Sequence, residues 1–168
     1  MHTIPFVILS LLNAATHPPA PDPVYAPLWL YQGSWEITRS STGAGAKPDR
    51  LTNECALLGR FFACAQTVNG KQEGLVIFIP ADKPGHYYTQ NVMPEGRATG
   101  RADLEIIGDH WTYLNRWQQD AGKIIYYKTT NAFTGKNRIH FEQAESADGN
   151  KWSVKDSGDE IRAGTPRK

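Results

Sequence analysis

The sequence predicts an all-β protein, an antiparallel meander β-barrel of about nine to ten strands. Short segments that alternate apolar and polar residues follow one another at close spacing along most of the chain. Turn signals rich in Gly, Asn and Asp separate these segments. Five Trp, seven Tyr and six Phe also favour strands. Together, the spacing and the composition indicate a barrel or a sandwich, and no internal repeat is visible.

The two cysteines predict the first hairpin. Cys55 and Cys64 lie on either side of Gly59-Arg60, and with that pair as the loop they face each other. The pair falls on a non-hydrogen-bonded position, where Cα atoms lie about 4.5 Å apart, at the short end of the disulfide range. We therefore expect a disulfide and an oxidising compartment. The alternative is two buried thiols.

The N-terminus also indicates export. Residues 4–12 are an apolar run, followed by Asn13-Ala14-Ala15, which resembles a signal peptide over 1–15 with cleavage after Ala15. The run is too short to span a bilayer, which needs about 20 apolar residues. The basic residue that usually precedes the apolar core of a signal peptide is missing, since no Lys or Arg comes before residue 4. The alternative interpretation of the apolar run is a buried N-terminal segment. The expected location is secreted or periplasmic.

The domain boundaries follow from proline and chain length. Five of the eleven prolines lie between 18 and 27, so residues 16–27 are predicted to be an exposed, extended tether. Residues 28–163 are then long enough for one barrel domain. Residues 164–168 are predicted to be a disordered tail.

Within the barrel, each strand is expected between turn signals. The predicted strands cover residues 35–38, 50–58, 60–68, 74–79, 86–92, 100–107, 110–117, 124–131 and 138–143, with a last strand carrying Arg162. Asn69-Gly70 predicts a type I′ turn, because both residues accept positive φ. Gly74 to Ile79 is continuously apolar and is predicted to be covered on both faces. Only Pro27 to Gln32 is expected to start a helix.

Charge and motifs exclude several functions. The net charge is +1, from 18 basic and 17 acidic residues without a block of either sign, so no nucleic-acid partner is expected. Motifs for nucleophilic, metal-dependent or phosphate chemistry are missing from the sequence. Asp103 and Glu105 share a strand face, and paired carboxylates can act in acid–base catalysis. The alternative is that the two side chains belong to a solvent-exposed face of the strand. His140 is expected to face solvent, the alternative being a haem ligand. We expect no metal site and no cofactor.

Three motifs carry a resemblance to a known family. They are the Gly33-Ser34-Trp35 opening, the Gly59 link between the cysteine strands, and the late stretch from Ser146 to Trp152. In order and spacing, the chain resembles secreted bacterial domains of unknown function with a lipocalin-like (calycin) β-barrel. The resemblance implies that Trp35 packs at the closed end of the barrel, under Arg162 from the last strand.

One stripe of aromatic residues suggests a site. Along 110–117, every second side chain lies on the same face of the strand, starting with Trp111. Two other strands add the rings of Tyr127 and Phe141. The predicted ligand-binding residues are Trp111, Tyr113, Asn115, Trp117, Tyr127 and Phe141, with Asn115 or Tyr88 orienting the ligand. The alternative is that the rings fill the barrel.

The predicted function is therefore an exported, non-catalytic protein that binds a small apolar or aromatic ligand in an apolar cavity. The alternatives are an enzyme, such as an isomerase or hydrolase, that uses the cavity, or a protein–protein interaction module. A dry, purely apolar cavity favours the binder, whereas convergent polar and titratable residues in the cavity favour the enzyme. A filled barrel with an exposed apolar patch favours the interaction module.

Overall fold

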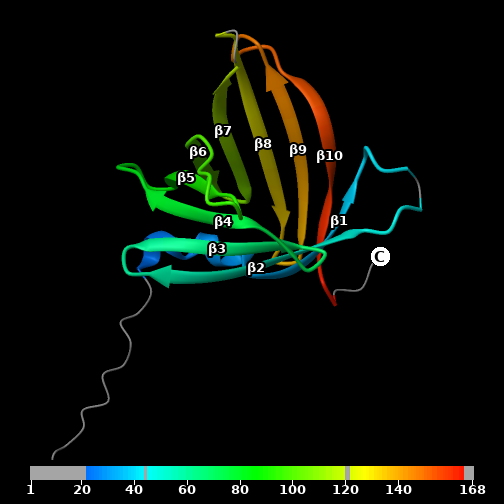
Figure 1. The fold of residues 1–168 in the computed structure, drawn as a ribbon. Coiled ribbons are helices and arrows are strands. Elements are labelled where there is room, and N and C mark those ends of the chain that lie inside the picture. Colours follow the sequence, from blue (N-terminus) through cyan, green and yellow to red (C-terminus); the bar gives the residue numbers. More distant parts are fainter. Residues whose placement is uncertain (1–21, 44, 120–121, 165–168) are drawn as a thin grey trace, which may run out of the picture.

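The computed structural model describes residues 22–43, 45–119 and 122–164. These residues confirm the predicted fold: ten antiparallel strands form a closed meander barrel (Figure 1). Each strand pairs with the next along the chain, and β1 also pairs with β10 to close the barrel. The strands are β1 (Gly33–Arg39), β2 (Asp49–Leu58), β3 (Phe61–Val68), β4 (Lys71–Pro80), β5 (His86–Val92), β6 (Ala102–Ile107), β7 (His110–Gln118), β8 (Ile124–Thr134), β9 (Arg138–Ser146) and β10 (Ser153–Arg162).

Two of the predicted segments lie wholly or mostly outside the described residues: the leader over 1–15 and the tail over 164–168. The exposed tether predicted for 16–27 is wrong in its last part. Pro23–Tyr25 forms the 3-10 helix η1, which begins with a proline at its first position and is capped by the Asp22 side chain. Tyr25 is buried, and its hydroxyl donates to the Arg60 carbonyl oxygen. This end of the proline-rich stretch therefore packs against the barrel through the Tyr25 ring.

A second 3-10 helix, η2 (Pro27–Tyr31), follows where the sequence predicts a helix start. Both short helices lie at one end of the barrel, behind β2 and β3 in the view of Figure 1. The packed core is at this end, which we call the closed end. Its buried members are Tyr25, Leu28, Trp35, Phe62, Cys64, Phe78, Tyr87, Leu104, Trp111, Phe133 and Ile139.

The cysteine hairpin has the predicted register. Cys55 faces Cys64 across β2 and β3, their Cα atoms are 4.0 Å apart, and a disulfide joins them. The next turn also agrees with the sequence. Asn69 has a φ of 52° and Gly70 a φ of 78°, the pair of positive angles that a type I′ turn requires.

Arg162 ties the closed end together. Its guanidinium carbon lies 4.2 Å from the centre of the Trp35 ring, as the Gly-x-Trp resemblance implies. The same group donates to the carbonyl oxygens of Leu30, at 2.8 Å, and Gln32, at 2.5 Å. Gly33 leaves room for it, because a Cβ there would lie 2.8 Å from the guanidinium. Arg162 therefore binds carbonyl groups at the end of η2 that the short helix leaves unpaired.

The outer wall of the barrel differs from the prediction for β4. Ile79 is exposed, so the apolar run from Gly74 to Ile79 is not covered on both faces. The reason is the topology: η1 and η2, the only helices in the described residues, pack at the barrel end and not along its wall. None of the described helices has the length and apolar character needed to cross a membrane.

Candidate ligand-binding site

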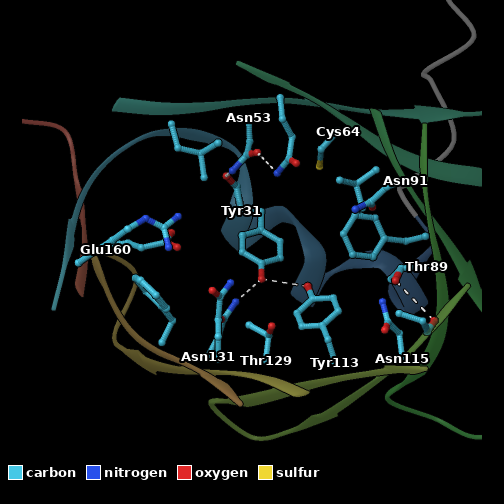
Figure 2. Close-up of a pocket in the computed structure, with 18 residues that line it drawn as sticks. Tyr31, Asn53, Cys64, Thr89, Asn91, Tyr113, Asn115, Thr129, Asn131 and Glu160 are labelled. Atoms are coloured by element: carbon cyan, nitrogen blue, oxygen red, sulfur yellow. Dashed lines mark hydrogen bonds between the residues drawn. The ribbon is translucent and has the colours of Figure 1, made fainter. Parts of the chain in front are cut away.

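A cavity of about 350 Å³ occupies the barrel interior beyond the closed end (Figure 2). Helix η2 and all ten strands contribute to its wall. The lining residues are Tyr31, Arg39, Leu51, Asn53, Cys64, Gln66, Val76, Phe78, Thr89, Asn91, Ala102, Tyr113, Asn115, Thr129, Asn131, Phe141, Gln143 and Glu160. Asn91 and Gln143 are exposed and mark the mouth of the cavity.

The lining carries many polar groups beside its apolar surface, so the prediction of an apolar cavity is wrong in its chemistry. Twelve of the eighteen residues carry a hydroxyl, amide, carboxyl or guanidinium group. The reason lies in the inward positions of the strands, which hold amides and threonines at this level and rings nearer the closed end. Of the rings in the predicted stripe, Trp111 is a buried member of that packed core.

Tyr31 forms the centre of the cavity floor. Its hydroxyl accepts hydrogen bonds from the Tyr113 hydroxyl, at 2.9 Å, and from the Asn131 amide nitrogen (Figure 2). Its backbone carbonyl accepts from the Trp35 indole nitrogen and the Asn53 amide nitrogen, at 3.1 and 3.3 Å. Burial raises the pKa values of Tyr31 and Tyr113 well above the ordinary range. Both hydroxyls are therefore neutral at physiological pH. Four hydrogen bonds to Tyr31, two to its hydroxyl and two to its carbonyl oxygen, fix the position of the floor.

Glu160 is the acidic group of the cavity. Its Oε2 atom is buried and has no hydrogen-bond partner. Burial raises the pKa of the Glu160 carboxyl to about 7, and the Arg39 guanidinium opposes this rise. Arg39 itself pairs with Asp156, with its Nη1 atom 2.9 Å from Oδ2. Glu160 thus changes its charge near neutral pH inside a site that can hold a small molecule.

Three buried acceptor atoms of the lining lack a partner among the described residues. They are the Oδ1 atoms of Asn115 and Asn131 and the Oε2 atom of Glu160. Buried polar atoms are nearly always hydrogen-bonded in folded proteins. These three acceptors around one cavity can each accept a hydrogen bond from a donor of another molecule.

The structure divides the predicted site residues into two groups. Tyr113, Asn115 and Phe141 line the cavity. Trp111, Trp117 and Tyr127 do not. Trp111 is fully buried in the closed-end core, with its ring centre 4.8 Å from Tyr31 and 4.7 Å from Phe133. At this level the rings fill the barrel, which was the alternative interpretation of the aromatic stripe.

Trp117 and Tyr127 lie on the lumenal face but beyond the cavity. Tyr127 is the direct strand neighbour of Asn115, and Trp117 lies two residues further along β7. Their side chains are 48% and 37% exposed, respectively. They belong to the wall of β7 to β10 that stands upright in Figure 1. Tyr88, in contrast, alternates with the lumenal Tyr87 and Thr89 and lies on the outer face under Arg101.

The other chemical candidates of the sequence lie outside the barrel. His140 is on the exposed outer face, with Nδ1 3.0 Å from an oxygen of Asp159. None of the three described histidines lines the cavity, so the lumen offers no histidine ligand for haem. Asp103 and Glu105 are exposed on the outer face of β6. Within the described ranges, no group of three or more His, Cys, Asp or Glu side chains is placed to hold a metal ion.

Sequence reasoning identified Asn115 but missed the other amides of the lining, Tyr31 and Glu160. A signal for the amides exists, since Asn115, Asn131 and Gln143 all occupy inward positions of alternating strands. Tyr31 lies on a helix and reaches a partner 82 residues away. Glu160 looks like an ordinary strand carboxylate in the sequence. Only the closed barrel shows that it points inward.

Comparisons with known proteins support the fold. No family model matches the chain, and no curated protein matches it. Among solved structures, the chain is similar to the crystal structure of Rv2717c from M. tuberculosis, with 14% sequence identity and a TM-score of 0.50. The match covers 84% of this chain and 98% of that chain. At this identity the likeness concerns the fold alone, a ten-stranded antiparallel β-barrel in the protein described here.

Proposed function

We propose that this protein is an exported, non-catalytic binder of a small polar molecule, which it holds in the barrel cavity. The observation that carries the proposal is the polar lining with three unmatched buried acceptors. The cavity volume of about 350 Å³ lies within the range of small-molecule sites. The cavity also argues against the interaction-module alternative, which rests on a filled barrel.

The energetics favour a ligand rich in hydrogen-bond donors. A buried acceptor without a partner costs about 1–3 kcal/mol, and a donor group of the ligand removes that cost. The floor is already in place, because Tyr31 is held by Tyr113, Asn131, Trp35 and Asn53. A site fixed in this way loses little side-chain freedom when the ligand enters.

The two exposed rings above the cavity fit a role in the same site. Tyr127 is the strand neighbour of Asn115, and Trp117 continues the same face of β7. We infer that these rings contact the part of the ligand that projects from the cavity mouth. Such a ligand joins a polar end to a flat or apolar end, which retains the aromatic-binding part of the function predicted from the sequence.

The lipocalin-like resemblance and the hairpin disulfide support the remaining parts of the proposal. Lipocalin-like barrels hold small molecules in the lumen. A disulfide between Cys55 and Cys64 suits a secreted or periplasmic protein, because cytosolic thiols are kept reduced.

A second candidate is an enzyme that uses the same cavity. Its support is the convergence of polar groups with the titratable Glu160, since a carboxyl with a pKa of about 7 is suited to act as a general base at neutral pH. The binder is proposed first because Glu160 is the only carboxyl group of the lining, so no second carboxyl is in place as its acid–base partner. The distinguishing result is turnover: an enzyme converts the molecule that stabilises the protein, whereas a binder returns it unchanged. Mass spectrometry of the ligand before and after incubation separates the two.

Thermal unfolding with a panel of small polar and apolar molecules tests the binding proposal. A ligand at a hundredfold excess over its Kd stabilises the protein by about 2.7 kcal/mol. Ala102→Trp places a large ring in the cavity wall, and Ala65→Trp adds the same ring to the exposed outer face of β3 as the matched control. We expect polar molecules to raise the Tm of the wild type and of Ala65→Trp but not of Ala102→Trp. A shift that persists in Ala102→Trp, or no shift with any molecule, contradicts the proposal.

A further inference from the structure

We propose that the ligand carries a protonated amino, amidino or guanidino group, and that this cation pairs with Glu160 in the cavity. The inference rests on the proposed binding function and names the ligand class. It follows from the charges around the cavity, from the chemistry of the unmatched atoms and from the neighbours of Glu160.

The two charged residues of the lining, Arg39 and Glu160, differ in their partners. Arg39 is the only cationic side chain among the lining residues, and it is already occupied. Its Nη1 atom lies 2.9 Å from an oxygen of Asp156, and its guanidinium carbon lies 5.3 Å from the Phe141 ring centre. Glu160 has no ion pair and keeps a buried oxygen without a partner. A ligand cation would supply the missing opposite charge.

The carboxyl group decides the class of ligand. An asparagine amide presents either a donor or an acceptor when it turns, so Asn115 and Asn131 alone accept many partners. An ionised carboxylate presents acceptors only. It forms its strongest hydrogen bonds with charged N–H donors. In the same cavity, the Asn131 Oδ1 atom is a second unmatched acceptor for the remaining N–H groups of such a cation.

The other charged groups beside Glu160 pair with each other. From β1, Arg39 faces Glu160 and is held by Asp156. From β9, the inward residues are Ile139, Phe141 and Gln143, none of which titrates. Tyr31 and Tyr113 complete the surroundings as neutral hydroxyls, because burial raises their pKa values. Among the lining residues, Glu160 is therefore the only carboxyl group, and the nearby Asp156 on β10 is already paired with Arg39.

The affinity for such a cation should depend on pH. Burial raises the pKa of the Glu160 carboxyl to about 7 in the free protein. A cation pairs with the ionised form, so below this pH its binding must first remove the proton. For a ligand that stays cationic throughout, the affinity should fall by up to tenfold for each pH unit below 7.

Isothermal titration calorimetry with two matched pairs of probes tests the inference. Benzamidine and tyramine are cations, while benzamide and 4-hydroxyphenethyl alcohol have nearly the same shape without the charge. Glu160→Gln removes the carboxylate and keeps its size. Asp159→Asn is the matched control, because it removes a carboxylate from the adjacent, outward-facing position of β10. Melting curves show whether each variant is folded.

We expect both cations to bind the wild type and Asp159→Asn more tightly than their neutral partners at pH 8. Glu160→Gln should weaken the cations by about tenfold to a hundredfold, the range of a charged hydrogen bond, and leave the neutral probes nearly unchanged. Benzamidine should bind the wild type more weakly at pH 6 than at pH 8.

The outcomes separate this inference from the function on which it rests. If the neutral probes bind as tightly as the cations and Ala102→Trp abolishes both, the inference is overturned and cavity binding stands. If Glu160→Gln binds the cations as the wild type does, the inference is also overturned. If none of the four probes binds the folded wild-type protein, the result counts against both.

Discussion

The two halves of the barrel interior differ in how many of their buried polar atoms have hydrogen-bond partners. At the closed end, large rings pack together and Arg162 donates to the carbonyl groups at the end of η2. The indole nitrogen of Trp111 is the exception, since it is buried without a partner. In the half that holds the cavity, amides and a carboxyl replace the rings, and three acceptor atoms are unmatched.

This difference separates stability from binding within one fold. Burial of apolar surface is the main source of stability, and it is concentrated where the barrel is filled. Buried polar atoms without partners destabilise a protein, and they are retained where they serve a function. Changes at the closed end should therefore alter the unfolding free energy, whereas changes around the cavity should alter binding and its pH dependence.

The largest effect is expected from Trp35→Ala at the closed end. Trp35 is fully buried, and its indole nitrogen bonds to the Tyr31 carbonyl. Its loss should reduce the free energy of unfolding by about 3–5 kcal/mol, as measured by urea denaturation. A loss below about 1 kcal/mol would show that the filled end does not carry the stability of the barrel.

The next effect is a pH dependence that arises at the cavity. The pKa of Glu160 is raised from 4.5 to about 7 in the folded state, so the folded protein binds the proton more tightly than the unfolded chain. The stabilisation is complete below pH 4.5 and is lost as pH rises through 7. It amounts to about 3 kcal/mol at most.

Unfolding curves between pH 4 and 8 measure this contribution. Glu160→Gln should remove that part of the pH dependence, while Asp159→Asn should retain it. Equal slopes in the wild type and Glu160→Gln would show that Glu160 titrates normally and that the polar half is less buried than the structure indicates.

The hairpin disulfide is expected to contribute about 2–3 kcal/mol, from the loss of chain entropy in the unfolded state. Replacing Cys55 and Cys64 together by serine should lower the free energy of unfolding by this amount. Thiol labelling of the unfolded, unreduced protein gives an independent check. Two reactive thiols per chain would contradict the disulfide and the export inferred from it.

Arg162→Ala should have the smallest of these effects, about 1–2 kcal/mol, since a cation over a Trp ring contributes about 0.5–2 kcal/mol. The variant keeps Trp35 in its place, so it should be clearly more stable than Trp35→Ala in urea. Equal losses in the two variants would mean that Arg162, rather than the buried ring, organises the closed end.

The parts of the fold that depend on local sequence were predictable. The Cys55–Cys64 register follows from counting outward from a two-residue loop, and Asn69-Gly70 specifies its own turn. The contact between Tyr31 and Tyr113 joins residues far apart in the chain. No local pattern encodes such a contact.

The level of a residue along the barrel axis was not predictable. Trp111 and Trp117 share one face of β7, yet one is in the core and the other is exposed beyond the cavity. Six residues of strand span about 20 Å, which is enough to cross from one environment to the other. Alternation in the sequence shows which side chains share a face but not how deep each one lies. For this reason the aromatic stripe predicted an apolar site where the structure has a polar one.

Native mass spectrometry of the protein purified from the organism that makes it tests the central claim most directly. The account predicts one small polar molecule bound to the wild type and to Ala65→Trp, and none bound to Ala102→Trp. A protein that carries no small molecule under these conditions, or an Ala102→Trp variant that carries the same molecule as the wild type, would contradict the claim that the polar half of the barrel is a binding site.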